Sequence, residues 1–184
     1  AWIEPAAAPT RIAIPAPDDL HIDDAPGHAA WAAARAFLPA AREAVITPLL
    51  DTAKLLYDGP WIAERAAAFG DFAAAHPGAL HPVTEAIIGG AARFTAVDAF
   101  RGLYKLAEHR RAAEDFFARF DVLVVPSVPN FPTLAELEAD PIGPNARLGT
   151  YTNFVNLLDL AALAVPGPKR PDGLPAGITL IGPR

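Results

Sequence analysis

A tyrosine and an arginine stand eight residues apart in the segment LLYDGPWIAER, which runs from Leu55 to Arg65. Between them, Gly59-Pro60 ends one helical pattern and allows another, because proline lacks an amide donor but is tolerated in a first helical turn. We therefore expect Tyr57 at the end of one helix and Arg65 on the second turn of the next. A turn at this point could bring a guanidinium and a phenol together to hold and orient a carboxylate.

A simpler arrangement explains the same two residues. Arg65 would form an ion pair with a nearby acid, Asp58 or Glu64, and Tyr57 would lie in the core. The spacing alone favours this alternative over a carboxylate-binding site.

Few other residues could do chemistry, since the chain has one serine, Ser127, and no cysteine. A nucleophile elbow needs glycines around its serine, whereas Pro126 and Pro129 flank this one, so we expect its hydroxyl to bond backbone groups at a strand end. Lys54 lies three residues before Tyr57 with no serine near it, and we expect it on the surface of its helix.

No pattern indicates a metal or a cofactor. The five histidines form no ligand pair at helical spacing, and His76 and His81, each followed by proline, are typical of caps or turns. The acidic segment 18–24 lacks the ligand order of a calcium loop, so we expect a solvated loop whose Asp24 caps the next helix. There is no phosphate-binding loop and no GxGxxG motif, which leaves nucleotide binding without support.

The composition of the 184-residue chain, with 52% hydrophobic residues, is that of one globular domain. A net charge of −6 without a basic stripe argues against nucleic-acid binding. No apolar run approaches the roughly 20 residues that span a bilayer, and residues 1–17 have no basic region followed by an apolar one that would indicate a signal peptide. We therefore expect a cytoplasmic protein with no membrane contact. The chain contains no methionine and ends at ITLIGPR, which predicts a piece of a longer polypeptide.

Helical and strand patterns alternate along the chain. Four consecutive apolar residues in DVLVVP are typical of a strand buried on both faces of a parallel or mixed sheet. At least three strands with flanking helices predict the α/β class. The expected elements are a strand within 11–17, helices over 28–42, 49–57, 60–76, 81–90 and 91–120, a strand over 122–125, a short helix within 126–145, a partly helical segment over 150–166 and a terminal strand over 173–183.

The longest expected helix, over 91–120, has an apolar face and a charged segment. One apolar stripe runs along it, and the segment EHRRAAED around Arg110 is expected to be its solvated face and turn. The stripe consists of Phe94, Val97, Phe100, Leu103, Tyr104 and Ala107.

The segments TYTNFVNLLDLAALAVP and DGLPAGITLIGP, with FDVLVVPSVP before them, resemble the C-terminal half of the amidase signature family. LLYDGPWIAER and LGTYTNFVNLLDL are the most specific segments, and they are similar to the allophanate hydrolase branch. HPVTEAII and DAFRGLYKLAEHR match that branch in the same order. The resemblance runs from about Arg11 to Pro183. It implies an α/β chain that is part of the amidase-signature fold, a mixed sheet flanked by helices. Residues 1–184 would then be the C-terminal portion of a single amidase domain.

The resemblance also implies an activity. Amidases of this family cleave amides with a serine nucleophile, a second serine in a cis peptide, a lysine and a backbone oxyanion hole. The implied substrate is the small anion allophanate, whose hydrolysis in urea degradation gives ammonia and carbon dioxide. Tyr57 and Arg65 match the residues that bind this substrate, the arginine through its carboxylate. The catalytic residues belong to the family's N-terminal half, to which nothing here corresponds, so we expect no catalytic residue, no metal and no cofactor in this chain. Family members often dimerise, which allows a homodimer.

Two alternatives stay open. The chain could belong to another amidase that acts on a neutral amide, although an unpaired Arg65 in an apolar pocket would cost desolvation energy. It could also be a free-standing, non-catalytic module that binds a small carboxylate or a partner protein. Such a module would have a closed core, whereas part of a larger domain would expose apolar surface where the rest packs.

Overall fold

The computed structural model describes residues 8–57 and 59–184, with Tyr57 described by its backbone alone. Within this part of the chain, five strands form one sheet in the order β2-β1-β3-β5-β4. β1 runs parallel to β2 and β3, whereas β5 runs antiparallel to β3 and β4. The sheet is therefore mixed and the chain α/β, as the sequence predicts. The strands are β1 (Ile12–Pro15), β2 (Arg42–Ala44), β3 (Val122–Pro126), β4 (Leu160–Pro166) and β5 (Gly177–Pro183).

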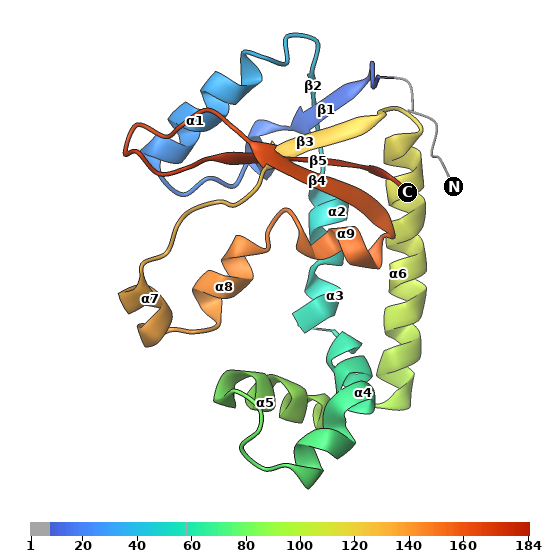
Figure 1. Ribbon diagram of the computed structural model, residues 1–184. Helices are drawn as coiled ribbons and strands as arrows, with labels where there is room; N and C mark the ends of the chain where they lie inside the picture. The colour runs from blue at the N-terminus through green and yellow to red at the C-terminus, as the bar shows by residue number, and fades with distance from the viewer. Residues whose placement is uncertain (1–7, 58) are drawn as a thin grey trace, which may run out of the picture.

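Helices flank this sheet and also extend away from it (Figure 1). Figure 1 shows α1 on one side of the sheet and α2 and α9 on the other, with α4 and α5 at the far end of the molecule and α6 running alongside from that end to the sheet. The α-helices are α1 (Ala25–Arg35), α2 (Thr47–Thr52), α3 (Lys54–Tyr57), α4 (Trp61–Ala75), α5 (Pro82–Gly89), α6 (Ala96–Phe117), α7 (Leu134–Ala139), α8 (Gly143–Leu148) and α9 (Asn153–Leu157), with 3-10 turns η1 (Pro17–Asp19) and η2 (Gly90–Arg93).

The central strand β3 is buried along its whole length, which confirms the prediction for DVLVVP. Successive side chains of a strand point to opposite faces, so β3 contributes to two hydrophobic clusters. Leu123 and Val125 belong to the larger cluster, and Val122 and Val124 pack with Trp31 of α1 in the smaller one. The strand thus joins the two layers that cover the sheet.

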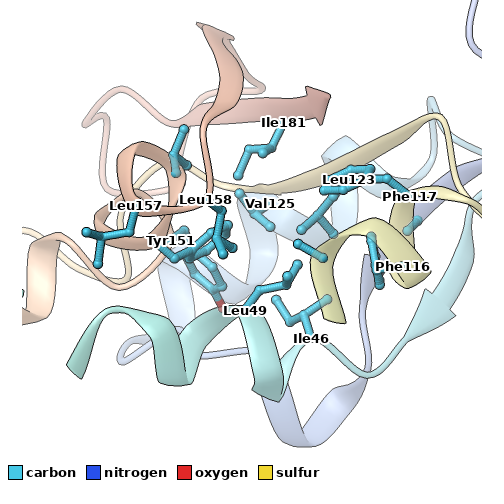
Figure 2. Close-up of a cluster of buried hydrophobic side chains, with 14 of the residues drawn as sticks. Ile46, Leu49, Phe116, Phe117, Leu123, Val125, Tyr151, Leu157, Leu158 and Ile181 are labelled. Carbon is cyan, nitrogen blue, oxygen red and sulfur yellow. The ribbon is translucent and has the colours of Figure 1, made fainter. Parts of the chain in front are cut away.

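The larger cluster contains side chains from elements that are distant in sequence (Figure 2). It brings α2, the C-terminal end of α6 and the segment that includes α9 onto one face of the sheet. Burying side chains of this size stabilises the fold by about 1.5–3 kcal/mol each. The residues labelled in Figure 2 are Ile46, Leu49, Phe116, Phe117, Leu123, Val125, Tyr151, Leu157, Leu158 and Ile181.

The predicted helix over 28–42 is wrong at its C-terminal end. α1 ends at Arg35, Pro39 lies in the connection, and residues 42–44 form the edge strand β2. Proline cannot donate a backbone hydrogen bond within a helix, which accounts for the break. The predicted cap is confirmed, because the Asp24 carboxylate accepts a 2.7 Å hydrogen bond from the Gly27 amide.

The predicted partly helical segment over 150–166 also differs from the structure in its second half. α9 ends at Leu157, Asp159 adopts a positive φ of 55°, and the Leu- and Ala-rich run that follows is the strand β4. These residues favour a helix by propensity, but their pairing with β5 overrides it. The four residues Ala161 to Ala164 are exposed, so β4 is an apolar strand with both faces open.

The longest helix, α6, is shorter than predicted and turns its apolar stripe outward. Its start is set by a capping box between Thr95 and Asp98. The buried face of α6 consists of Gly102, Leu106, Ala113, Phe116 and Phe117. Its exposed large apolar residues are Val97, Phe100, Leu103 and Tyr104.

The charged residues of the segment 108–115 around Arg110 are exposed, as predicted, but the predicted turn is wrong, because α6 continues to Phe117. Arg110 donates through Nε to the carbonyl oxygen of Leu157 at 3.1 Å, and this contact joins α6 to α9. Ala113 on the next turn is buried. None of the helices in the described residues is long and apolar enough to cross a membrane.

Candidate functional site

The junction between α3 and α4 carries the two residues that the sequence singles out. Tyr57 is the last residue of α3, and Arg65 lies on the second turn of α4, as predicted. Arg65 is half-buried. Asp58 and the side chain of Tyr57 lie outside the described part of the structure. A contact between Tyr57 and Arg65, and an ion pair between Asp58 and Arg65, therefore both stay predictions.

The turn at this junction is tight. The Gly59 amide donates to the Lys54 carbonyl at 3.1 Å, and the Ala63 amide donates to the Pro60 carbonyl at 2.9 Å. A Cβ atom on Gly59 would lie 2.7 Å from the carbonyl oxygen of Leu55, so a larger residue would force the two helices apart. This turn fixes the separation and direction of the two helices that carry the predicted pair.

Helix α6 holds the start of α4 from the other side. A Cβ atom on Gly102 would lie 2.4 Å from Cγ of Pro60 and 3.1 Å from the ring of Trp61. The absence of a side chain at this buried glycine lets the two helices cross in close contact. Ile62 on the same turn is also buried. The backbone that carries Arg65 is therefore anchored at its first turn.

A cleft of about 540 Å³ lies between α4, α5 with η2, and α8. Arg65 follows Ile62, a lining residue, by three positions, which places the two on the same side of α4. Arg93 is the charged residue among those that line the cleft in the described part of the chain. A mostly apolar cleft with a few polar side chains suits a small organic ligand. The lining residues are Ile62, Val83, Ala86, Ile87, Gly90, Arg93, Pro141, Ile142, Asn145 and Ala146.

The acidic segment 18–24 is not the solvated loop that the sequence predicts. Asp19 is buried, and its carboxylate accepts hydrogen bonds from the amides of Ile46 (2.6 Å) and Thr47 (3.0 Å) and from the Thr47 hydroxyl (2.7 Å). Tyr151 donates its hydroxyl to the Asp19 carbonyl at 3.2 Å. Burial raises the pKa of Tyr151 to about 12, so the phenol stays protonated and able to donate.

The same loop reaches α8, one wall of the cleft. Arg147 donates from Nε to Oδ2 of Asp23 at 3.1 Å and from a second guanidinium nitrogen to Oδ1. This pair holds the pKa of Asp23 below its usual range. Sequence analysis could not find this contact, because the two residues are separated by 124 positions and neither belongs to a known motif.

Comparison with known proteins decides the family. The family model described as Amidase matches residues 71–184, which is more than half of the chain. The chain belongs to the amidase family. This amidase chain is 47% identical over 137 residues to urea amidolyase from Lachancea kluyveri, and equally to that from Saccharomyces cerevisiae. Each alignment covers 73% of this chain and 8% of the relative.

Solved structures agree with this assignment. Kluyveromyces lactis allophanate hydrolase superposes on the amidase chain with a TM-score of 0.87 and 42% identity, over 95% of this chain and 29% of that one. The structure of 6-aminohexanoate cyclic dimer hydrolase gives a TM-score of 0.72 at 16% identity, which supports the shared fold alone. The amidase chain therefore spans less than a third of the allophanate hydrolase that it matches. The predicted resemblance to the family is confirmed.

The remaining candidate residues of the amidase chain have structural roles. The Ser127 hydroxyl lies 2.8 Å from the Thr179 hydroxyl on the neighbouring strand, not against the backbone groups predicted for it. Lys54 is exposed and bonds Asp51 at 2.6 Å, which confirms its surface position. His81 accepts from the Val83 amide as the N-cap of α5, as predicted.

His76 is the C-cap of α4, also as predicted. The described residues contain no group of three or more histidines or acids placed to hold a metal ion.

Proposed function

We propose that this chain is the substrate-binding part of an amidase that hydrolyses allophanate. The observation that carries the proposal is the 42% identity to Kluyveromyces lactis allophanate hydrolase across 95% of the chain. Arg65 would hold the carboxylate of allophanate, and Tyr57 would orient it through its phenol. The α3–α4 junction supports this role, because both residues flank one tight turn.

The chemistry of the substrate explains why an arginine is suited to this position. Allophanate is carboxyurea, a small anion with a planar carboxylate at one end and an amide at the other. A guanidinium binds a carboxylate through two parallel, charge-assisted hydrogen bonds, which fix its direction as well as its place. Fixing one end of so small a molecule also fixes the amide that is to be cleaved relative to a nucleophile.

The catalytic residues would come from the rest of the same domain. We take residues 1–184 as the C-terminal portion of a single amidase domain, whose serine, cis-serine and lysine lie outside this chain. The exposed apolar stripe of α6 and the open strand β4 support this view, since such surfaces are normally covered. The complete enzyme would release ammonia and carbon dioxide during urea degradation in the cytoplasm, without a cofactor, as a monomer or a homodimer.

The test is ammonia release from allophanate by the complete enzyme. Removing one partner of a desolvated charge pair costs about 2–5 kcal/mol, so Arg65→Ala should lower kcat/KM by roughly a hundredfold or more. Arg65→Lys keeps the charge but loses the planar fork, and we expect an intermediate loss. Tyr57→Phe removes one hydrogen bond, which corresponds to about a three- to tenfold loss.

A matched control is Arg35→Ala, which removes an exposed arginine on α1 that pairs with Glu43. Its activity should stay within about twofold of wild type, because exposed ion pairs contribute little. Full activity of Arg65→Ala would refute the binding role. Hydrolysis of neutral amides without turnover of allophanate would instead support the alternative amidase. No hydrolysis of either would favour a non-catalytic carboxylate-binding module.

A further inference from the structure

Helix α8 forms one wall of the cleft but buries none of its own residues in the core. It is six residues long, and none of its residues, all of which are described, is buried. Isolated helices of this length are not stable in water, so the position of α8 depends on its contacts with the rest of the molecule. Asn145 and Ala146 on this helix, and Ile142 just before it, line the cleft. Whatever holds α8 therefore also sets the shape of the cleft.

The contact with the sheet side of the molecule is made by Arg147. Its guanidinium binds both carboxylate oxygens of Asp23, with Nε at 3.1 Å from Oδ2. Two-pronged arginine–carboxylate pairs of this geometry are the surface ion pairs that do contribute energy. The Thr150 hydroxyl donates to the Arg147 carbonyl at 2.6 Å and closes the end of the helix.

Asp23 is itself held in place, so it can act as a fixed support. Its amide donates to the Pro129 carbonyl at 3.1 Å, just beyond β3. Two residues earlier, the His21 amide donates to the hydroxyl of the buried Tyr151 at 2.6 Å. The Asp23–Arg147 pair thus connects a helix without buried residues to a loop that is anchored on the core.

The neighbouring aspartate has a different set of contacts. Asp24 caps α1 and binds Arg170 through both carboxylate oxygens, at 3.0 and 2.8 Å. The side chain of Arg170 is only 5% exposed and also binds Asp172. This pair joins α1 to the β4–β5 connection, and neither Asp24, Arg170 nor Asp172 lines the cleft. The two adjacent aspartates therefore offer a matched comparison.

We propose that the Asp23–Arg147 ion pair is a positioning contact that holds α8 as a wall of the cleft and thereby tunes substrate binding. Asp24, one residue after Asp23, pairs with Arg170 and stabilises the fold instead. The part of this inference that concerns substrate rests on the proposed function. The part that concerns the position of α8 does not.

The first experiment follows hydrogen–deuterium exchange of residues 143–150 in the full-length protein. Asp23→Asn and Arg147→Gln each break the pair, and we expect exchange of this segment to become about three- to tenfold faster, with α1 unchanged. Asp24→Asn should instead speed exchange in α1 and leave residues 143–150 as they are. Unchanged exchange of this segment in Arg147→Gln would overturn the inference.

The second experiment measures steady-state kinetics with allophanate. Asp23→Asn and Arg147→Gln should raise KM about three- to tenfold and leave kcat within twofold. Arg147→Lys, or the exchanged pair Asp23→Arg with Arg147→Asp, should recover part of the loss. Equal KM changes in Asp24→Asn and Asp23→Asn would contradict a specific role for Asp23. If the wild-type enzyme does not turn over allophanate, the proposed function fails, while the exchange measurement still decides whether the pair holds α8.

Discussion

The sheet body and the helical arm of this molecule differ in how many of their residues are buried. The sheet body consists of the five described strands with α1, α2, α9 and the C-terminal half of α6, and the helical arm consists of α4, α5, η2 and the N-terminal half of α6. All five residues of β3 are buried. In α4, by contrast, Ile62 is the one buried residue, and the fully described α5 has none.

The arm also exposes a set of large apolar side chains. They lie on α4 and α6, and their exposed fractions range from 50% to 66%. Several large apolar side chains exposed on neighbouring helices indicate a place where another surface packs. The difference indicates that the core around β3 is specified by this sequence alone, whereas the arm, like the open edge strand β4, needs a cover. The residues are Phe69, Phe72, Val97, Phe100, Leu103 and Tyr104.

The largest expected contrast is between two leucines, one in each region. Leu123→Ala in β3 should lower the free energy of unfolding by about 2–5 kcal/mol, because it leaves a cavity in a fully packed cluster. Leu103→Ala, at 53% exposure on the arm, should change it by less than about 0.5 kcal/mol. Urea unfolding of the 184-residue chain measures both. Equal losses would show that the arm is packed as tightly as the body.

A smaller effect concerns the buried acid of the body. Asp19→Ala removes three hydrogen bonds to Ile46 and Thr47 at the start of α2. Hydrogen bonds to charged groups contribute about 1.5–3 kcal/mol, and we expect a loss of that size in the same unfolding assay. Asp18→Ala changes the exposed neighbouring acid and serves as the control. A loss in Asp18→Ala as large as in Asp19→Ala would contradict the structural role of Asp19.

The sequence predicts the α3–α4 junction and β3 because their signals are local. Gly59-Pro60 marks the turn wherever the rest of the chain lies, and the apolar run of β3 needs both faces covered. β4 was missed because its Leu- and Ala-rich composition favours a helix until β5 pairs with it. β2 was missed because three residues, two of them charged, carry no strand pattern.

In the candidate site, too, the sequence predicts only the features that depend on local signals. The places of Tyr57 and Arg65 on their helices could be predicted, since they depend on the local turn. The cleft could not, because its walls come from helices that are distant in sequence. The ion pair between Asp23 and Arg147, which contacts the α8 wall of the cleft, spans 124 positions of the sequence. No local sequence pattern predicts such a pair.

The most direct measurement for the central claim compares two substrates of nearly the same shape. Biuret replaces the carboxylate oxygen of allophanate with an amide nitrogen and so removes the charge. If Arg65 recognises the carboxylate, Arg65→Ala in the complete enzyme should lower kcat/KM for allophanate by roughly a hundredfold and leave any turnover of biuret within a few-fold. Arg35→Ala should change neither value. An equal fall for both substrates in Arg65→Ala, or no fall for allophanate, would contradict carboxylate recognition by Arg65.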